Sequence, residues 1–210
     1  MARILITSGP TRQYLDPVRY LTNASSGRMG AALAEAALAL GHEVIVISGP
    51  VEVSYPAAAE VVPVISTEEM LAACRQAFEN CDGLIGAAAP CDYRPVHVET
   101  NKIAKTGEPL LLHLIETDDI VATLGAEKGY RWVVGFALET EDHRLRALAK
   151  LERKHCDLIV SNGVEAMDAL NNQVEILNPA GTILKQVSGS KLEVAHEIMA
   201  VIAERLIPCR

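Results

Sequence analysis

Short apolar runs alternate with amphipathic stretches along the N-terminal part of the chain. Residues 4–7 and 43–48 are mostly apolar and β-branched, which is typical of buried strands. Between them, apolar residues in the segment 28–40 recur at helical spacing until Gly41, and glycine is a common helix stop. The pattern therefore predicts a strand, a helix and a second strand, which together form a βαβ unit.

The alternation continues to the C-terminus. Further strands are predicted at 61–65, 84–88, 110–115, 133–138 and 158–161, and a hairpin at 174–177 and 182–187 around residues 178–181. Helices are predicted from Ser66 through Phe78, from Asp118 or Asp119, over 142–155 and from Ser190, with capping boxes Ser66/Glu69 and Ser190/Glu193. One face of the last helix carries Leu192, Ala195, Met199, Ile202 and Leu206.

This order of elements predicts the fold class. We expect residues 1–210 to form a single α/β domain, Rossmann-like and three-layered, with a mainly parallel sheet. A long connection between the first strand and the first helix, and a C-terminal β-hairpin followed by a helix, complete the expected architecture. Since half of the 210 residues are apolar, the core is large enough to need no disulfides.

Charge and cysteine usage argue against several classes of partner. The formal net charge of −8 disfavours nucleic acid or an anionic membrane as the main partner. The five cysteines are odd in number and lack C-x-x-C spacing, which favours reduced thiols in a cytoplasmic protein over a disulfide framework or zinc site. The sequence shows no signal-peptide pattern and no apolar run long enough to cross a bilayer.

The stretch 23–30 carries the first functional signal. Ser25, Ser26 and Gly27 stand directly before the predicted helix, where free backbone N–H groups and the helix dipole favour a bound phosphate. The alternative is a capped helix after a loop. The connection 8–27 is far longer than the tight glycine-rich turn of a dinucleotide-binding unit, which disfavours a hydride-transferring dehydrogenase. Such a long loop above a sheet usually lines a site.

Two further segments add to this picture. The strand predicted at 84–88 is short and made of small residues, which indicates that something packs closely against its carboxyl end, where open parallel sheets bind ligands. An irregular polar arm follows at 92–108. It carries Lys102 and Lys105 at places where no periodicity requires a cation.

These motifs resemble those of the phosphopantothenate–cysteine ligase family, also called phosphopantothenoylcysteine synthetase. The match runs in order through S-G-P-T-R (8–12), L-D-P-V-R-Y (15–20), N-x-S-S-G-x-M-G (23–30), A-A-A (87–89), D-Y-R-P (92–95), K-I-x-K (102–105), D-I-V (119–121), V-G-F-A (134–137), E-T (139–140) and D-L-I-V-x-N (157–162). One such block is easily matched by chance, but the whole series in order is not.

The resemblance implies a reaction. Family members join the carboxylate of 4′-phosphopantothenate to the amine of L-cysteine on the route to coenzyme A. They activate the carboxylate with a nucleoside triphosphate and Mg²⁺, usually CTP in bacteria and ATP in animals, and release pyrophosphate and then the nucleoside monophosphate. The bacterial type of motif favours CTP for this chain. Many relatives are fused to a flavin-dependent phosphopantothenoylcysteine decarboxylase, so such a domain or protein is an implied partner.

The resemblance also assigns residues. Asn23 is implied near the acyl group and Lys102 over the reacting phosphates, both as catalytic residues. Nucleotide binding is implied for Ser25, Ser26, Gly27, Gly86, Ala87, Ala88, Asp92, Lys105, Asp118, Asp119, Ile120, Val121, Phe136, Lys150 and Lys154. The two last lysines lie four residues apart on a predicted helix, in line with Arg146, and form a basic stripe. No residue is assigned as a direct metal ligand.

The length of the arm and the leucines that follow it predict that the chain pairs with a second copy of itself. The arm is long and polar for a simple crossover, and the leucines that follow it at 110–112 and 114 need burial. Family members are typically dimers. We therefore expect a homodimer in which the arm pairs the protomers and carries Lys102 towards the neighbour's site.

Two other functions stay open at this point. Cys91 lies beside the expected site and, with His97 or His113 as base, would make the chain a nucleophilic acyl-transfer enzyme. A regulatory domain that binds a nucleotide without catalysis is the other alternative. The chain departs from the common family pattern at Ala104 and at residues 117–118, which bears on the nucleotide contacts.

Overall fold

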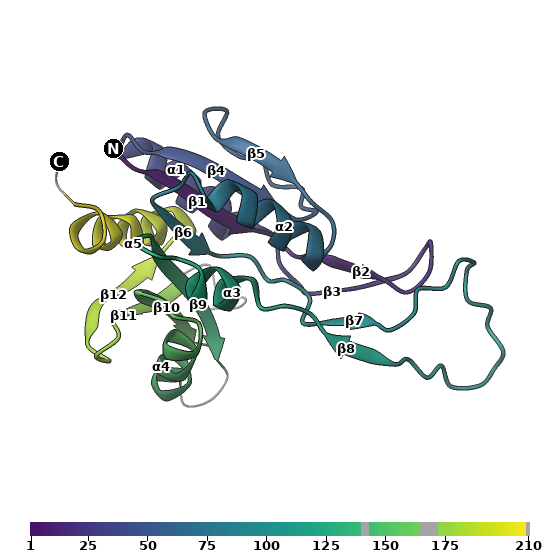
Figure 1. The fold of residues 1–210 in the computed structure, drawn as a ribbon. Coiled ribbons are helices and arrows are strands. Elements are labelled where there is room, and N and C mark those ends of the chain that lie inside the picture. Colours follow the sequence, from purple (N-terminus) through teal and green to yellow (C-terminus); the bar gives the residue numbers. More distant parts are fainter. Residues whose placement is uncertain (140–142, 164–171, 209–210) are drawn as a thin grey trace.

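The computed structural model describes residues 1–139, 143–163 and 172–208. Its centre is an eight-stranded sheet in the order β12-β11-β10-β9-β6-β1-β4-β5 (Figure 1). The strands are β1 (Arg3–Ser8), β4 (Glu43–Ser48), β5 (Glu60–Pro63), β6 (Gly83–Gly86), β9 (Trp132–Glu139), β10 (Leu158–Gly163), β11 (Asn172–Leu177) and β12 (Ile183–Gly189). Six neighbouring strands of this sheet, β10, β9, β6, β1, β4 and β5, pair in parallel. β11 pairs antiparallel with both β10 and β12. The mainly parallel sheet and the C-terminal hairpin are thus confirmed.

Helices cover both faces of the sheet. α1 (Arg28–Ala39) and α5 (Lys191–Arg205) pack on one face, and α2 (Thr67–Phe78), α3 (Ile120–Ala126) and α4 (His143–Arg153) pack on the other. Successive strand residues point to opposite faces, so the fully buried Ile4 and Ile6 face α1 and α5, whereas Leu5 faces the other layer. The predicted three-layer arrangement is confirmed.

Two small ribbons project from the sheet (Figure 1). β2 (Arg12–Tyr14) and β3 (Tyr20–Thr22) form a hairpin inside the connection that was predicted as loop. β7 (Tyr93–Pro95) and β8 (Leu114–Glu116) pair at the base of the arm. The strand predicted at 110–115 is therefore wrong over 110–113, because its three-residue partner β7 reaches only residues 114–116.

Several predicted element ends are corrected by the structure. The strand predicted at 84–88 ends at Gly86, because the chain turns where the Ala87 N–H bonds the carbonyl of Ile85 (3.2 Å). At α2, Ser66 accepts from the Glu69 N–H, but the Glu69 carboxylate accepts from the Ile65 N–H, so only half of the predicted capping box forms.

The last helix keeps its predicted start but not all of its predicted face. The capping box of Ser190 and Glu193 is present. Leu192 is 37 % exposed, so its assignment to the buried face is wrong. The buried stripe of α5 is centred on Ile198, from which Leu192 is turned by about 120° around the helix.

Candidate functional site

The carboxyl ends of β1 and β6 lie side by side at the centre of the sheet. From β1 the chain proceeds to β4 and β5 on one side, and from β6 it proceeds to β9 and β10 on the other. Connections that leave two such strands run over opposite faces and leave a crevice where parallel sheets bind ligands. Here the two connections meet first at a hydrogen bond from the Ala89 N–H to the Gly9 carbonyl (2.9 Å). The ligand edge of the sheet is therefore formed by the segments 8–27 and 87–92.

Gly27 begins α1 at this edge. Its φ of 72° is a left-handed conformation that favours glycine, and no side chain caps the helix. Ser25 and Ser26 are thus not helix caps, which contradicts the capped-helix alternative. A cleft of about 630 Å³ opens here, and its charged and polar lining consists of both serines, Arg12, Arg28 and Glu52. The free first-turn N–H groups of α1, the serine hydroxyls and two guanidinium groups can together hold an anionic ligand.

A buried hydroxyl network lies beneath the Gly27 turn. The Ser8 hydroxyl donates to the Gly27 carbonyl (3.1 Å), and the Tyr55 hydroxyl donates to the Ser8 oxygen (2.9 Å) and contacts the Ser48 hydroxyl (2.7 Å). A Cβ on Gly30 would lie 2.1 Å from the Ser8 hydroxyl oxygen, so only glycine allows α1 this close to β1. Tyr55 could not be identified from the sequence, because a single tyrosine in a loop belongs to no periodic pattern.

Asn23 joins the two connections of the ligand edge. Its side-chain amide donates to the carbonyl of Pro90 (2.8 Å) and, over a longer distance, to that of Ala89 (3.4 Å). The structure therefore brings this predicted catalytic residue to the carboxyl end of β6. Because the second contact is long, one amide hydrogen is only weakly engaged by the protein.

The small residues at the end of β6 have a structural reason. A Cβ on Gly86 would lie 2.5 Å from a methyl group of Val121, so glycine lets the start of α3 pack onto β6. The Ala88 N–H donates to the Thr7 hydroxyl (3.2 Å) of β1. The close packing that the sequence predicted is present, and at Gly86 its partner is Val121. Ile120 is 3 % exposed and belongs to the core, so its side chain is not accessible to a ligand.

Asp119 and Lys154 form an ion pair beside this edge. The Lys154 ammonium lies 3.0 Å from one Asp119 oxygen, while the other accepts from the Ala122 N–H (3.1 Å) and caps α3. The Asp92 carbonyl accepts from the Thr117 N–H (2.9 Å), which places the exposed Asp92 next to the segment before α3. Three predicted nucleotide residues, far apart in the sequence, are thus gathered around the start of α3.

Phe136 and Lys150, two further predicted nucleotide residues, lie on opposite faces of the sheet. Phe136 packs partly buried against the core shared by α1 and α5, whereas Lys150 belongs to α4, which covers the opposite face. Lys150 is partly buried one turn before Lys154, and Asp118 is exposed beside Asp119. Both lysines of the predicted stripe lie near the same helix end, and Lys154 is paired with Asp119 rather than free.

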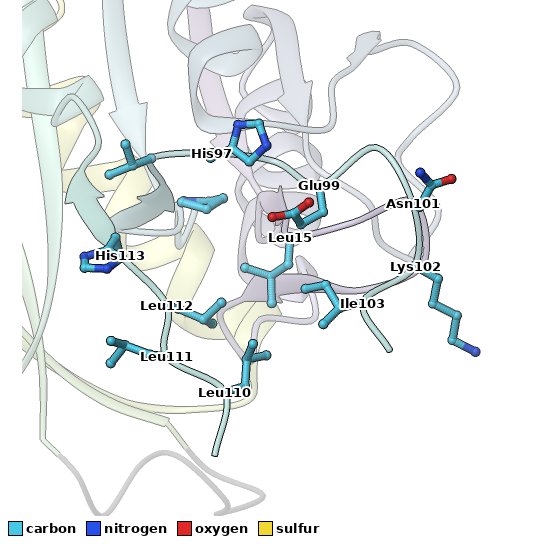
Figure 2. Close-up of a pocket in the computed structure, with 12 residues that line it drawn as sticks. Leu15, His97, Glu99, Asn101, Lys102, Ile103, Leu110, Leu111, Leu112 and His113 are labelled. Carbon is cyan, nitrogen blue, oxygen red and sulfur yellow. The ribbon is translucent and has the colours of Figure 1, made fainter. Parts of the chain in front are cut away.

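Lys102 and Lys105 lie on the arm, away from Asn23. An apolar hollow of about 470 Å³ lies between the arm and Leu15, and the leucines at 110–112 line it. Figure 2 shows that the Lys102 side chain points away from this hollow. The arm contacts the tip of the β2–β3 hairpin, where Arg19 donates to the Ile103 carbonyl (3.0 Å). Asn23 follows the other end of that hairpin, about 13 Å along the extended strand β3.

Comparison with known proteins agrees with the motifs of the sequence. The family described as "DNA/pantothenate metabolism flavoprotein C-terminal domain" matches residues 1–206. The chain belongs to this family. This confirms the recognition made from the sequence, that its motifs are those of the phosphopantothenate–cysteine ligase group.

The relatives are longer proteins. The chain is 42 % identical over 205 residues to the coenzyme A biosynthesis bifunctional protein CoaBC of Bacillus subtilis, covering 95 % of this chain and 50 % of that protein. It therefore spans about half the length of the curated relatives that it matches. A crystal structure of the C-terminal domain of a CoaBC protein is 39 % identical, with a TM-score of 0.82, and the match covers 97 % of this chain and 95 % of that one. The DNA/pantothenate metabolism flavoprotein from Streptococcus pneumoniae is 25 % identical, with a TM-score of 0.85 and coverage of 97 % and 99 %.

Cys91 has a structural place in this family member. It is 6 % exposed, and its thiol donates to the Tyr93 carbonyl (3.2 Å). Its own carbonyl accepts from the hydroxyls of Thr67 (3.1 Å) and Thr117 (2.7 Å), and its N–H donates to Thr11 (2.7 Å). These bonds tie the β6–β7 connection to three other segments and bury the sulfur, which disfavours Cys91 as a nucleophile.

The other described cysteines are also buried free thiols. Burial raises the pKa of Cys74 and Cys156 to about 12 and that of Cys81 to about 11, so all three stay protonated at neutral pH. The prediction of reduced thiols agrees with these four residues, and Cys209 lies outside the described part of the chain. Among the helices described, none is long and apolar enough to span a bilayer.

Proposed function

We propose that this chain is a nucleotide-dependent ligase that joins 4′-phosphopantothenate and L-cysteine through an acyl-nucleotide intermediate. The observation that carries the proposal is that an amide donor, Asn23, and an uncapped helix start, Gly27, both lie at the ligand edge. That edge belongs to a chain that matches the C-terminal domain of a coenzyme A biosynthesis protein over nearly its full length. We take residues 1–210 as one catalytic domain.

The first step is activation of the carboxylate. A carboxylate oxygen of 4′-phosphopantothenate attacks the α-phosphorus of the nucleotide. A bond between that oxygen and the α-phosphorus forms, and the bond between the α-phosphorus and the leaving pyrophosphate breaks. The cleft lined by Ser25, Ser26 and the guanidinium groups of Arg12 and Arg28, at the uncapped start of α1, supports the proposal that this place holds the phosphates, and Glu52 on its rim leaves room for a cation that accompanies them. Holding the triphosphate and the carboxylate in line removes most of the entropy barrier of the step.

The second step is transfer to cysteine. The amine attacks the acyl carbon, the nucleoside monophosphate leaves, and the amine loses a proton. Negative charge develops on the acyl oxygen during this attack. Asn23 stands at the carboxyl end of β6 with one amide hydrogen weakly engaged, so it can donate to that oxygen without moving from Pro90. A preorganised donor of this kind stabilises the transition state more than the ground state.

The remaining nucleotide contacts are proposed around the start of α3. Asp92 would bind a ribose hydroxyl, and the ion pair of Asp119 and Lys154 would border the phosphates or ribose. The backbone at Gly86, Ala87, Ala88, Ile120 and Val121, with Asp118, Phe136 and Lys150, would enclose the rest of the nucleotide.

Magnesium would enter with the triphosphate. Among the described residues, no group of three or more His, Cys, Asp or Glu side chains could hold a metal ion. Mg²⁺ commonly keeps several waters and binds through substrate phosphates with one or two carboxylates, and Asp92, Asp118 and Asp119 around the start of α3 and Glu52 in the cleft are carboxylates at this edge. When bound, the ion would neutralise phosphate charge.

A homodimer with composite sites is part of the proposal. Lys102 lies on the arm next to the tip of the β2–β3 hairpin, and Asn23 lies at the base of that hairpin. The exposed Leu110 and Leu111, which follow the arm, need a partner surface. A second copy would cover them and receive Lys102, with Lys105 beside it, at its own ligand edge. Because the curated relatives are bifunctional, we propose a flavin-dependent phosphopantothenoylcysteine decarboxylase as the functional partner, in the cytoplasm.

The reaction itself is the test of this proposal. With 4′-phosphopantothenate, L-cysteine, Mg²⁺ and either CTP or ATP at equal concentration, we expect phosphopantothenoylcysteine and pyrophosphate in equal amounts, and faster initial rates with CTP. Product by mass spectrometry and pyrophosphate by a coupled assay measure both. A preference for ATP would overturn the choice of nucleotide only. Nucleotide binding without any pyrophosphate release would favour the non-catalytic regulatory domain instead.

A further inference from the structure

Asp16 is a fully buried carboxylate that the proposed reaction does not use. It lies in the turn of the β2–β3 hairpin with 0 % of its surface exposed. One oxygen accepts from the N–H groups of Val18 and Arg19 (2.8 Å each), and the other accepts from the Arg19 guanidinium (2.9 Å) and the Ile103 N–H (3.1 Å). Four donors thus converge on one side chain, and one of them comes from the arm.

These contacts keep the carboxylate charged. Burial alone raises the pKa of Asp16, but the hydrogen bonds from Val18, Ile103 and Arg19 and the charge of Arg19 outweigh it, so its pKa lies below the ordinary value of 3.8. The group is therefore ionised at neutral pH, and its hydrogen bonds are of the stronger, charge-assisted kind.

Both backbone groups of Ile103 are held at this place. Its N–H donates to Asp16 and its carbonyl accepts from Arg19 (3.0 Å), so the pair holds the two peptide units on either side of the Ile103 Cα. A second attachment lies nearby, where the Glu99 N–H donates to the Leu15 carbonyl (2.9 Å). The arm carries only short stretches of regular structure, so these contacts decide where residues 99–103 stand.

We propose that Asp16 is a positioning residue that, together with Arg19, fixes the arm at Ile103 and thereby sets where Lys102 and Lys105 stand. Ile103 directly follows Lys102 and precedes Lys105 by two residues. Without the grip, each lysine would sample many positions, and the productive one would be populated only part of the time. The inference rests on the proposed function, because Lys102 is assigned to the reacting phosphates there.

The test combines a protease with a mutant cycle. Trypsin cleaves after lysine only where the chain can leave its packing, so the bonds after Lys102 and Lys105 report the freedom of the arm. Asp16→Asn keeps the shape but removes the charge, and we expect about tenfold faster cleavage at these two bonds. We also expect kcat to fall about tenfold with KM for the nucleotide little changed, and Asp16→Asn/Lys102→Ala to be no slower than Lys102→Ala alone.

A matched control separates positioning from general stability. Asp82→Asn removes another carboxylate that accepts a backbone N–H, from Arg3 (2.7 Å), at the opposite end of the sheet. It should leave cleavage at the arm and kcat unchanged. If Asp16→Asn leaves both readouts at the wild-type level, or if its loss adds fully to that of Lys102→Ala, the proposal is overturned.

A second variant covers the case in which Asp16→Asn does not fold. Both Ile103→Pro and Ile103→Ala lose most of the isoleucine side chain, but only the proline variant also loses the N–H that Asp16 accepts from and has its φ fixed by the ring. We expect faster cleavage after Lys105 and lower kcat for the proline variant alone; equal behaviour of the two variants would contradict the role of this hydrogen bond. Because proteolysis needs no substrate, it tests the grip on the arm even if the wild type shows no ligase activity, so the two proposals fail separately.

Discussion

Asn23→Ala is expected to slow formation of phosphopantothenoylcysteine by about 10²-fold or more, the scale for losing one preorganised donor to a developing oxyanion. The alanine keeps the backbone of the turn but removes the amide that lies at the carboxyl end of β6. Because the donor acts mainly in the transition state, kcat should carry most of the loss and KM for 4′-phosphopantothenate little of it. Steady-state kinetics of product formation measure this split.

Two controls accompany the Asn23 variant. Asn80→Ala truncates an exposed asparagine next to the end of α2, far from the ligand edge, and should keep wild-type turnover. Thermal unfolding of both variants shows whether the lost bond to Pro90 weakens the fold. Near-wild-type turnover of Asn23→Ala would make Asn23 a structural turn residue, as its bond to the β6–β7 connection alone would allow.

Lys102→Ala is expected to lower activity by a similar factor, and mixed dimers should show in which site the lysine acts. If Lys102 reaches across the interface, a dimer of one Lys102→Ala chain and one Asn23→Ala chain has one site with both lesions and one intact site. Activity should then return to about half of the wild-type level. If the lysine serves its own chain, every site keeps one lesion and the mixed dimer stays inactive.

The experiment uses two tags so that only heterodimers are assayed. Differently tagged chains are co-expressed, purified in two affinity steps and compared with each parent. Heterodimers as inactive as the parents would contradict the shared site while leaving the dimer itself in place. We expect recovery because Lys102 lies on the arm next to the hairpin tip, whereas Asn23 lies at the hairpin base.

The fold was largely predictable because its long elements have a clear period. The strand at residues 43–48 and the capping box at Ser190 were predicted as they occur, since buried strands are apolar throughout and capping boxes have fixed spacing. The β2–β3 hairpin was missed because strands of three residues show no periodicity. Leu111 was assigned to a strand on composition, but it lies between the arm and β8 and is 81 % exposed.

The site was predictable only where the motif itself lies at the ligand edge. Asn23 and the Gly27 turn were found in this way, because a glycine and two hydroxyls before a helix have a direct physical meaning. Asp16 and Tyr55 were not singled out as individual residues. Their significance depends on contacts with residues 87 and 47 positions away, Ile103 and Ser8, which no local pattern reveals.

The central claim is that the carboxylate is activated as an acyl nucleotide before cysteine takes part. Positional isotope exchange tests it most directly: CTP labelled with ¹⁸O in the α–β bridge is incubated with the protein, 4′-phosphopantothenate and Mg²⁺, without cysteine. When pyrophosphate forms reversibly, the phosphoryl group that was the β-phosphate can rotate before CTP re-forms. The label should therefore move from the bridge into non-bridging positions of the β-phosphate. Movement of the label that depends strictly on added cysteine would contradict the two-step account.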